Sequence, residues 1–164
     1  MRNKRWLRLL GVLVGITALL FIAAACDDDD DDDNGTTPDA TATAPADGDG
    51  GSVEVTLSND TSDLILTPSV GSIAAGTVTF NVTNADSLEH NFRVIRSDLA
   101  IDALPTDAGS VDEGAVDVRG STTADLSGGG TETVEVDLEA GSYVLICNVP
   151  GHYLGGMTVA FTVE

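Results

Sequence analysis

A short segment near the C-terminus carries three side chains that bind soft and borderline metal ions. It reads CNVPGHYLGGM, and Cys147, His152 and Met157 follow one another at equal spacing. The Pro-Gly and Gly-Gly pairs between them favour turns, so we expect one tight loop that brings a thiolate, an imidazole and a thioether together. Such donors disfavour hard cations such as calcium and magnesium. The loop therefore predicts a site for a softer metal ion.

A fourth donor, His90, lies in the tetrapeptide EHNF at the start of a predicted strand. Downstream of residue 26 the sequence contains no further histidine, cysteine or methionine. One thiolate and two imidazoles in a trigonal plane, with a weak axial thioether, form the ligand set of blue-copper sites. Structural zinc sites instead use four Cys, His or carboxylate ligands, so a thioether suits zinc less well. We therefore predict one copper ion with the ligands His90, Cys147, His152 and Met157.

Each of these residues alone has a simpler interpretation. An unpaired cysteine is commonly a small buried apolar side chain, and a lone methionine usually fills a core. One alternative is thus an adhesive or structural protein in which the four residues are incidental, and metal analysis separates it. Another is a cell-surface protein that binds or delivers copper without carrying electrons. The absence of Met-rich or His-rich secondary sites from the sequence disfavours this second alternative.

The residues from 51 onward are patterned as a β-protein. Short alternating segments separated by Gly, Pro, Asn and Asp are typical of an antiparallel sandwich or barrel. The predicted strands centre on Val53–Leu57, Leu64–Leu66, Val78–Val82, Phe92–Val94, Val134–Leu138, Tyr143–Cys147 and Val159–Val163. The run Tyr143–Cys147 is continuously apolar, as expected of a central strand covered on both faces.

The stretch 97–130 is the part with the weakest pattern. We expect a short helical turn around Leu99–Leu104 and a brief strand near Val116–Val118. Because so long an excursion is unusual in a compact domain, we expect it to pack over one end of the sandwich.

Residues 1–25 are predicted to be a secretory signal. Four basic residues precede an uncharged, almost wholly apolar run, Leu9–Ala25, which ends in Ala-Ala-Ala before Cys26. This junction resembles the lipobox of bacterial lipoproteins, which implies removal of 1–25 and lipidation of Cys26. The alternative is an uncleaved signal anchor, since an apolar run of this length is at the lower limit for spanning a bilayer. Both interpretations place the domain on the extracytoplasmic face of the cell membrane.

Residues 26–50 are predicted to form a disordered acidic linker. Asp27–Asp33 is an unbroken run of aspartates, and the following Gly, Thr, Pro, Ala and Asp residues show no apolar period. A calcium loop would need spaced ligands and a distal glutamate, which this segment lacks.

The net charge of the chain is −20, and residues 51–164 hold 17 acidic residues against three arginines. This acidity excludes nucleic acid as a partner. It favours a basic protein partner, although a solvated surface or adaptation to high salt is an alternative reason for it.

The pattern Cys-x4-His-x4-Met, preceded by His90-Asn91 and closed by a final strand, resembles the cupredoxin family over residues 52–164. The loop is most similar to those of rusticyanin and sulfocyanin. The resemblance implies a Greek-key β-sandwich with one type 1 Cu(I)/Cu(II) centre in the domain 51–164. It also implies that Asn91 ties the two ligand-bearing segments together.

The same resemblance implies an electron carrier rather than an enzyme, because the related copper enzymes need further histidines or a second loop cysteine. In this family the loop histidine typically reaches the surface, so His152 is the expected electron port. Pro150, Tyr153 and Leu154 are candidates for an apolar docking patch, and inward packing of Tyr153 and Leu154 is the alternative. We expect a monomer whose partner is a redox protein with a basic docking face, such as a cytochrome or an oxidase.

Overall fold

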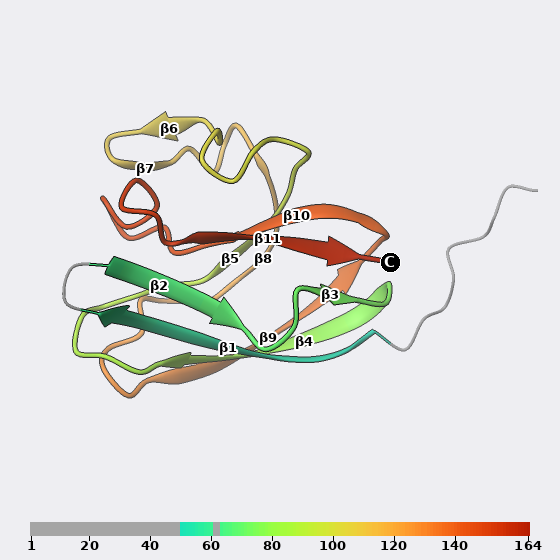
Figure 1. Cartoon of the computed structure of the whole chain (residues 1–164), viewed down its shortest axis with the longest axis horizontal. Coiled ribbons are helices and arrows are strands. Elements are labelled where there is room, and N and C mark those ends of the chain that lie inside the picture. The colour runs from blue at the N-terminus through green and yellow to red at the C-terminus, as the bar shows by residue number, and fades with distance from the viewer. Residues whose placement is uncertain (1–49, 61–62) are drawn as a thin grey trace, which may run out of the picture. The chain divides into compact units, whose positions relative to one another are not determined.

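The computed structural model describes residues 50–60 and 63–164 (Figure 1). The predicted signal 1–25, Cys26 and all of the acidic linker except Gly50 lie outside the described residues. Within the described ranges, no helix is long and apolar enough to cross a membrane.

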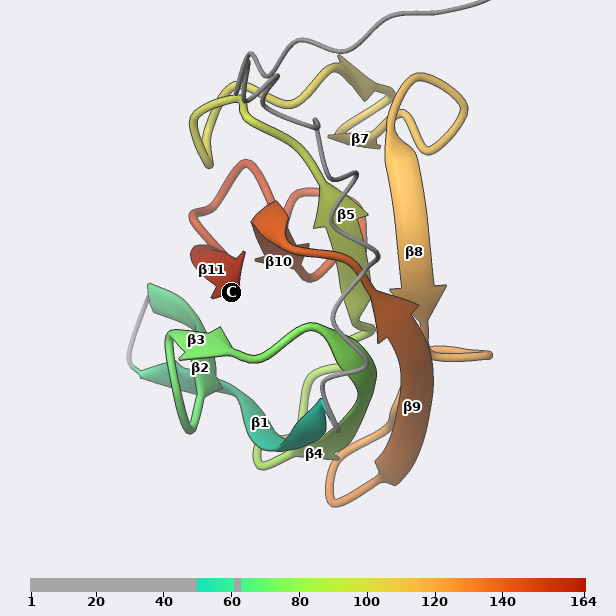
Figure 2. The ribbon, with the colours of Figure 1, turned by 90° about the vertical axis from the view of Figure 1, so that its right-hand side faces the viewer.

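Two β-sheets pack face to face as a sandwich. The strands are β1 (Gly51–Asp60), β2 (Asp63–Pro68), β3 (Ser72–Ile73), β4 (Gly76–Asn84), β5 (Arg93–Arg96), β6 (Thr106–Asp107), β7 (Ser110–Val111), β8 (Asp117–Ser121), β9 (Thr131–Leu138), β10 (Gly141–Ile146) and β11 (Thr158–Val163). The first sheet has the order β2-β1-β4-β9 and the second the order β3-β11-β10-β5-β8, while β6 and β7 form a separate hairpin. Figure 2 shows the two layers nearly end-on, with β8 and β9 at the same edge. The predicted all-β sandwich is confirmed.

The core between the sheets follows from the alternating pattern. In β1 the residues Val53, Val55 and Leu57 are buried, and the polar residues between them face outward. At the centre, the ring of Phe80 packs against Phe92 and Phe161, with ring centroids 5.3 and 5.7 Å away. Aromatic pairs at this separation add to the stability gained from burial alone.

Strand β10 is buried on both faces, as its continuous apolar run predicts. Tyr143, Leu145 and Cys147 belong to the core between the sheets. The alternate residues Val144 and Ile146 belong to a second cluster on the outer side of the second sheet.

The second cluster is covered by the excursion 97–130, which contributes Leu104 and Val111 to it. The excursion includes the hairpin β6–β7, which lies near the loop after β10 (Figure 1). It therefore covers the outer face of the second sheet as well as one end. The expected strand exists as β8. Around Leu99–Leu104, where the sequence predicts a short helical turn, the chain forms one i to i+3 turn, closed by the bond from Ala103 N–H to Ala100 C=O, and no helix.

Candidate metal centre

The ligand loop begins where β10 ends and folds back on itself. The N–H of Cys147 donates to the carbonyl of Met157 at 3.0 Å, and the N–H of Met157 donates to the carbonyl of His152 at 3.0 Å. Gly156, with φ of 93°, supplies a left-handed turn that residues with a side chain rarely adopt. The loop thus brings the three C-terminal donors together through its own backbone.

His90 reaches the same place from the segment that leads into β5. Its backbone forms a β-bridge with Leu126, with N···O distances of 3.1 and 2.6 Å. The side-chain amide of Asn84 donates to the carbonyl of Leu126 at 2.7 Å and to that of Leu88. These bonds fix the backbone on which His90 stands.

Three donor atoms form a compact triangle. The two Nδ1 atoms of His90 and His152 are 3.1 Å apart, and they lie 3.7 and 3.4 Å from Cys147 Sγ. A metal–nitrogen bond is about 2.0 Å long, so three ligands around one ion in a plane lie about 3.5 Å from one another. The triangle therefore fits one trigonally bound metal ion. Its donors lie within 4.8 Å of one another, and they form the only such cluster of His, Cys, Asp or Glu in the described part of the chain.

Met157 completes the donor set beside this triangle. It is fully buried and packs in the same apolar cluster as Cys147. Its backbone hydrogen bonds to Cys147 and His152 hold it next to both ligands. The backbone of Met157 therefore lies next to the two loop ligands, and its thioether is shielded from water.

The second nitrogen of His90 has its own partner, Asp86. The distance from His90 Nε2 to Asp86 Oδ2 is 2.9 Å, and the N–H of Leu88 donates to the other carboxylate oxygen. Burial by itself would raise the pKa of Asp86, but the hydrogen bonds from His90 and Leu88 outweigh it and lower the pKa. An ionised carboxylate therefore accepts the Nε2–H, which fixes the tautomer and leaves Nδ1 free to bind a metal.

The sulfur of Cys147 lies in an apolar and partly hydrogen-bonded pocket. Burial raises the pKa of the thiol, while the backbone N–H groups of Asn91 and Val149 act in the opposite direction. The Asn91 N–H lies 3.4 Å from the sulfur. Burial also lowers the pKa of His152, with a further contribution from nearby His90, so its imidazole is neutral and available as a ligand.

The family match agrees with this geometry, because the Sulfocyanin (SoxE) domain matches residues 48–164. The chain belongs to the sulfocyanin family. The donor set His90, Cys147, His152 and Met157 is accordingly a type 1 copper site. Sulfocyanins are electron-carrying cupredoxins, which confirms the prediction that the chain is not an enzyme.

Several solved structures share the fold. The chain is similar to a dithionite-reduced auracyanin from Roseiflexus castenholzii, with a TM-score of 0.51 and 23% identity over 70% of this chain and 96% of that one. For auracyanin B the TM-score is 0.50, with 25% identity over 74% and 91%. For rusticyanin from Thiobacillus ferrooxidans it is 0.50, with 18% identity over 69% and 77%. No curated protein matches the chain.

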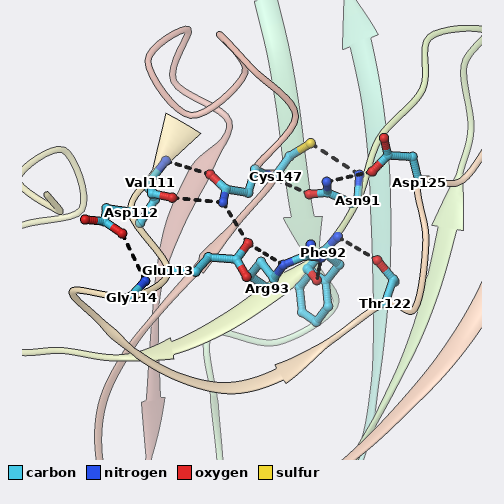
Figure 3. Close-up of polar contacts among 11 residues, drawn as sticks. Asn91, Phe92, Arg93, Val111, Asp112, Glu113, Gly114, Thr122, Asp125 and Cys147 are labelled. Carbon is cyan, nitrogen blue, oxygen red and sulfur yellow. Dashed lines mark hydrogen bonds and ion pairs between the residues drawn. The ribbon is translucent and has the colours of Figure 1, made fainter. Parts of the chain in front are cut away.

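Asn91 makes the link between ligand segments that the resemblance implies. Its side-chain oxygen accepts the N–H of Asn148 at 2.6 Å, and its side-chain nitrogen donates to Asp125 at 2.8 Å (Figure 3). One side chain thus ties the His90 segment to the residue after Cys147.

The expected docking patch is only partly exposed. Pro150 and Leu154 lie at the surface, and Leu154 is 63% exposed. Tyr153 does not belong to a surface patch, because it is 3% exposed and its hydroxyl accepts the N–H of Leu104 at 2.9 Å. The expectation fails for Tyr153 because the excursion 97–130 supplies both an apolar cover and a polar partner for this ring.

Sequence reasoning missed Asp86, Asn148 and Glu113, which all contact the ligand segments. Of the three, Asp86 could most readily have been predicted from the sequence. A histidine that binds a metal usually donates its other N–H to a carboxylate, and Asp86 lies one helical-turn spacing, i to i+4, before His90.

Proposed function

We propose that this sulfocyanin-family protein is a membrane-tethered electron carrier on the extracytoplasmic face of the cell membrane. The observation that carries the redox role is the triangle of Cys147 Sγ and the Nδ1 atoms of His90 and His152. Bound copper supplies a one-electron Cu(I)/Cu(II) couple at this triangle. The chain supplies ligands held in place by backbone bonds and packing, so a change of oxidation state requires little movement of the protein.

His152 is the proposed electron port. His90, Cys147 and Met157 are fully buried, whereas His152 is half-buried. The exposed residues Pro150 and Leu154 flank it in the loop and offer an apolar contact for a partner. The short path from solvent to the metal through one imidazole supports this choice.

The charge of the domain supports a basic redox partner, such as a cytochrome or an oxidase with a cationic docking face. The described residues contain three arginines, and each is ion-paired: Arg93 with Glu113, Arg96 with Glu139, and Arg119 with Asp117. Because the acidic residues of 51–164 far outnumber these arginines, the domain keeps a large excess of negative charge. We propose that the carrier acts as a monomer.

The tether is proposed from the sequence alone. Cys26 follows three alanines at the end of an apolar run, and we propose that it carries the lipid anchor. The acidic linker would then connect this anchor to the copper domain.

Copper loading of the purified chain tests the redox role. We expect an intense thiolate-to-copper absorption band and a reversible one-electron couple, and Cys147→Ser should abolish both. Cys26→Ser is the matched control, because it removes the only other cysteine and should leave the colour unchanged. A colourless copper complex would refute the proposal. Ready Cu(I) transfer to an acceptor without electron exchange with a cytochrome would favour the copper-delivery alternative.

Cell fractionation followed by mass analysis of the N-terminus of the membrane-bound protein tests the tether. We expect a chain that begins at Cys26 and carries a diacylglyceryl group on its thiol. A membrane-bound chain that still contains residues 1–25 would show that this segment acts as an uncleaved anchor instead.

A further inference from the structure

The residue after Cys147 is held from two sides by side-chain contacts. Asn148 donates its backbone N–H to Asn91 on the His90 segment, at 2.6 Å. Its side-chain oxygen accepts the N–H of Val111 at 2.7 Å, and its side-chain nitrogen donates to the carbonyl of Val111 at 3.1 Å. The amide of Asn148 therefore pairs with both backbone groups of one residue in β7, as a neighbouring strand would.

A third bond from this amide extends the contacts into a closed ring. The side-chain nitrogen of Asn148 also donates to Glu113 Oε1 at 2.8 Å, and Arg93 Nε donates to the same oxygen at 2.8 Å (Figure 3). Arg93 follows Asn91 closely in sequence, and its Nη1 donates to the carbonyl of Phe92 at 3.0 Å. The ring thus runs from Asn91 through Asn148, Glu113 and Arg93 back to the backbone beside Asn91.

The ring of contacts includes Asn148, the residue whose position affects the hydrogen bonding of the Cys147 sulfur. Asn148 lies directly between Cys147 and Val149. The N–H of Asn91 donates to the Cys147 sulfur at 3.4 Å, and the backbone N–H of Val149 also acts to lower the pKa of this thiol. Hydrogen bonding around the cysteine sulfur is one of the factors that set the potential of a type 1 copper site. If Asn148 were free to move, the N–H groups of Asn91 and Val149 would also shift relative to the sulfur.

From this geometry we propose that Glu113 and Asn148 are positioning residues for the copper ligand Cys147. The segment that leads from β7 toward β8 acts as an outer brace of the ligand loop, and Glu113 locks it to the strand that follows His90. The predicted effect on the midpoint potential rests on the proposed electron-carrier role. The brace itself does not, because it is formed by the protein without metal.

The test compares four variants in the full domain. Glu113→Ala and Asn148→Ala remove the brace. Glu113→Gln keeps an oxygen that can accept the Asn148 amide. Asp107→Ala is the matched control, because it removes one carboxylate from an exposed position elsewhere in the excursion 97–130.

The first readout is amide hydrogen exchange of the ligand loop, 147–157, in the metal-free protein. Glu113→Ala and Asn148→Ala should speed exchange roughly three- to tenfold, which corresponds to the net loss of about one hydrogen bond. Glu113→Gln should restore most of the protection, and Asp107→Ala should match the wild type.

The second readout is the copper-loaded protein. When the N–H···S bonds loosen, the thiolate becomes a stronger electron donor and favours Cu(II). Glu113→Ala and Asn148→Ala should therefore lower the midpoint potential and change the charge-transfer band, while Asp107→Ala should not. Loop exchange and potential in Glu113→Ala that equal those of Asp107→Ala would overturn the inference. A wild type without a reversible couple would refute the electron-carrier role, and the exchange data would still decide whether the brace exists.

Discussion

At the scale of single residues, the groups behind the ligands determine how the donors are presented. His90 is fully buried, yet both of its nitrogens are used: Nδ1 faces the triangle and Nε2 faces Asp86. The carboxylate makes the imidazole a stronger donor, and stronger donation favours the higher oxidation state of a bound metal.

Replacement of Asp86 tests this influence. Asp86→Asn should reduce the affinity for Cu(II) by about 10- to 100-fold and raise the midpoint potential, because a neutral amide polarises the imidazole less. A chelator competition titration and voltammetry measure the two quantities. Glu89→Gln is the control, since it removes an exposed carboxylate next to His90 in sequence. An equal effect of both variants would show that only overall charge matters.

The residue scale also shows what the sequence can and cannot reveal about the site. The four ligands were predictable because Cys, His and Met are so rare downstream of residue 26 that their spacing stands out. Asn148 and Glu113 were not predictable, because their contact joins positions 35 residues apart and leaves no local period. Such links depend on how the excursion packs, which a strand pattern does not encode.

At the scale of elements, the alternating strands were predictable and the excursion was not. An alternating apolar pattern predicts a strand that is buried on one face of its sheet. The continuous apolar run in β10 predicts a strand that is buried on both faces. These patterns do not say which segment covers the second face. Leu104 and Val111 do so from a stretch of turns and very short strands, where irregular spacing hides the apolar face.

The turn of the hairpin β6–β7 holds two residues in a backbone conformation that is unfavourable for residues with a side chain. Ala108 and Gly109 both have positive φ, 48° and 91°, as the tight turn between the two strands requires. The Gly109 carbonyl accepts the N–H of Gly151 at 2.8 Å, so this turn is also a contact to the ligand loop. Gly109→Ala should lower the free energy of unfolding by about 1–2 kcal/mol, because a Cβ disfavours this conformation.

Denaturant unfolding of the metal-free domain gives this value. No neighbouring atom lies closer than 3.8 Å to the position of the added Cβ, so the cost is that of the backbone alone. Ala108→Gly is the control and should leave stability equal or slightly higher. If it destabilises the domain as much as Gly109→Ala, backbone strain is not the cause.

The brace formed by Glu113 also predicts a pH dependence. Partial burial would raise the pKa of Glu113, but hydrogen bonds from Asn148 and Arg93 prevail and lower it. A carboxyl whose pKa is lowered on folding contributes stability above its unfolded pKa and loses it as the pH falls through the folded pKa. The wild type should therefore exceed Glu113→Gln in stability at neutral pH, and the difference should vanish in acid.

Urea unfolding of both proteins from about pH 7 to about pH 3 measures this difference. Asp107→Asn corrects for the loss of one negative charge from an acidic domain. Parallel profiles for wild type and Glu113→Gln would contradict the expectation.

At the scale of the whole molecule, the acidity belongs to more than one part of the chain. Residues 51–164 account for 17 of the 27 acidic residues, and the rest lie in the predicted linker. Because all three arginines of the domain are ion-paired, the field around the domain is set by its excess of carboxylates. A domain of this kind attracts cations from a distance and repels anions.

This field predicts the salt dependence of electron exchange. With a basic cytochrome as the partner, the second-order rate constant should fall steeply as ionic strength rises, because salt screens the attraction that steers the encounter. With an acidic redox protein the rate constant should instead rise with salt. Stopped-flow oxidation of the reduced copper domain, followed at the thiolate-to-copper band, measures both. Since the linker lies outside residues 51–164, its removal should leave the sign of each slope unchanged. A salt-independent rate with the basic partner would mean that contact at Pro150 and Leu154, rather than charge, governs the encounter.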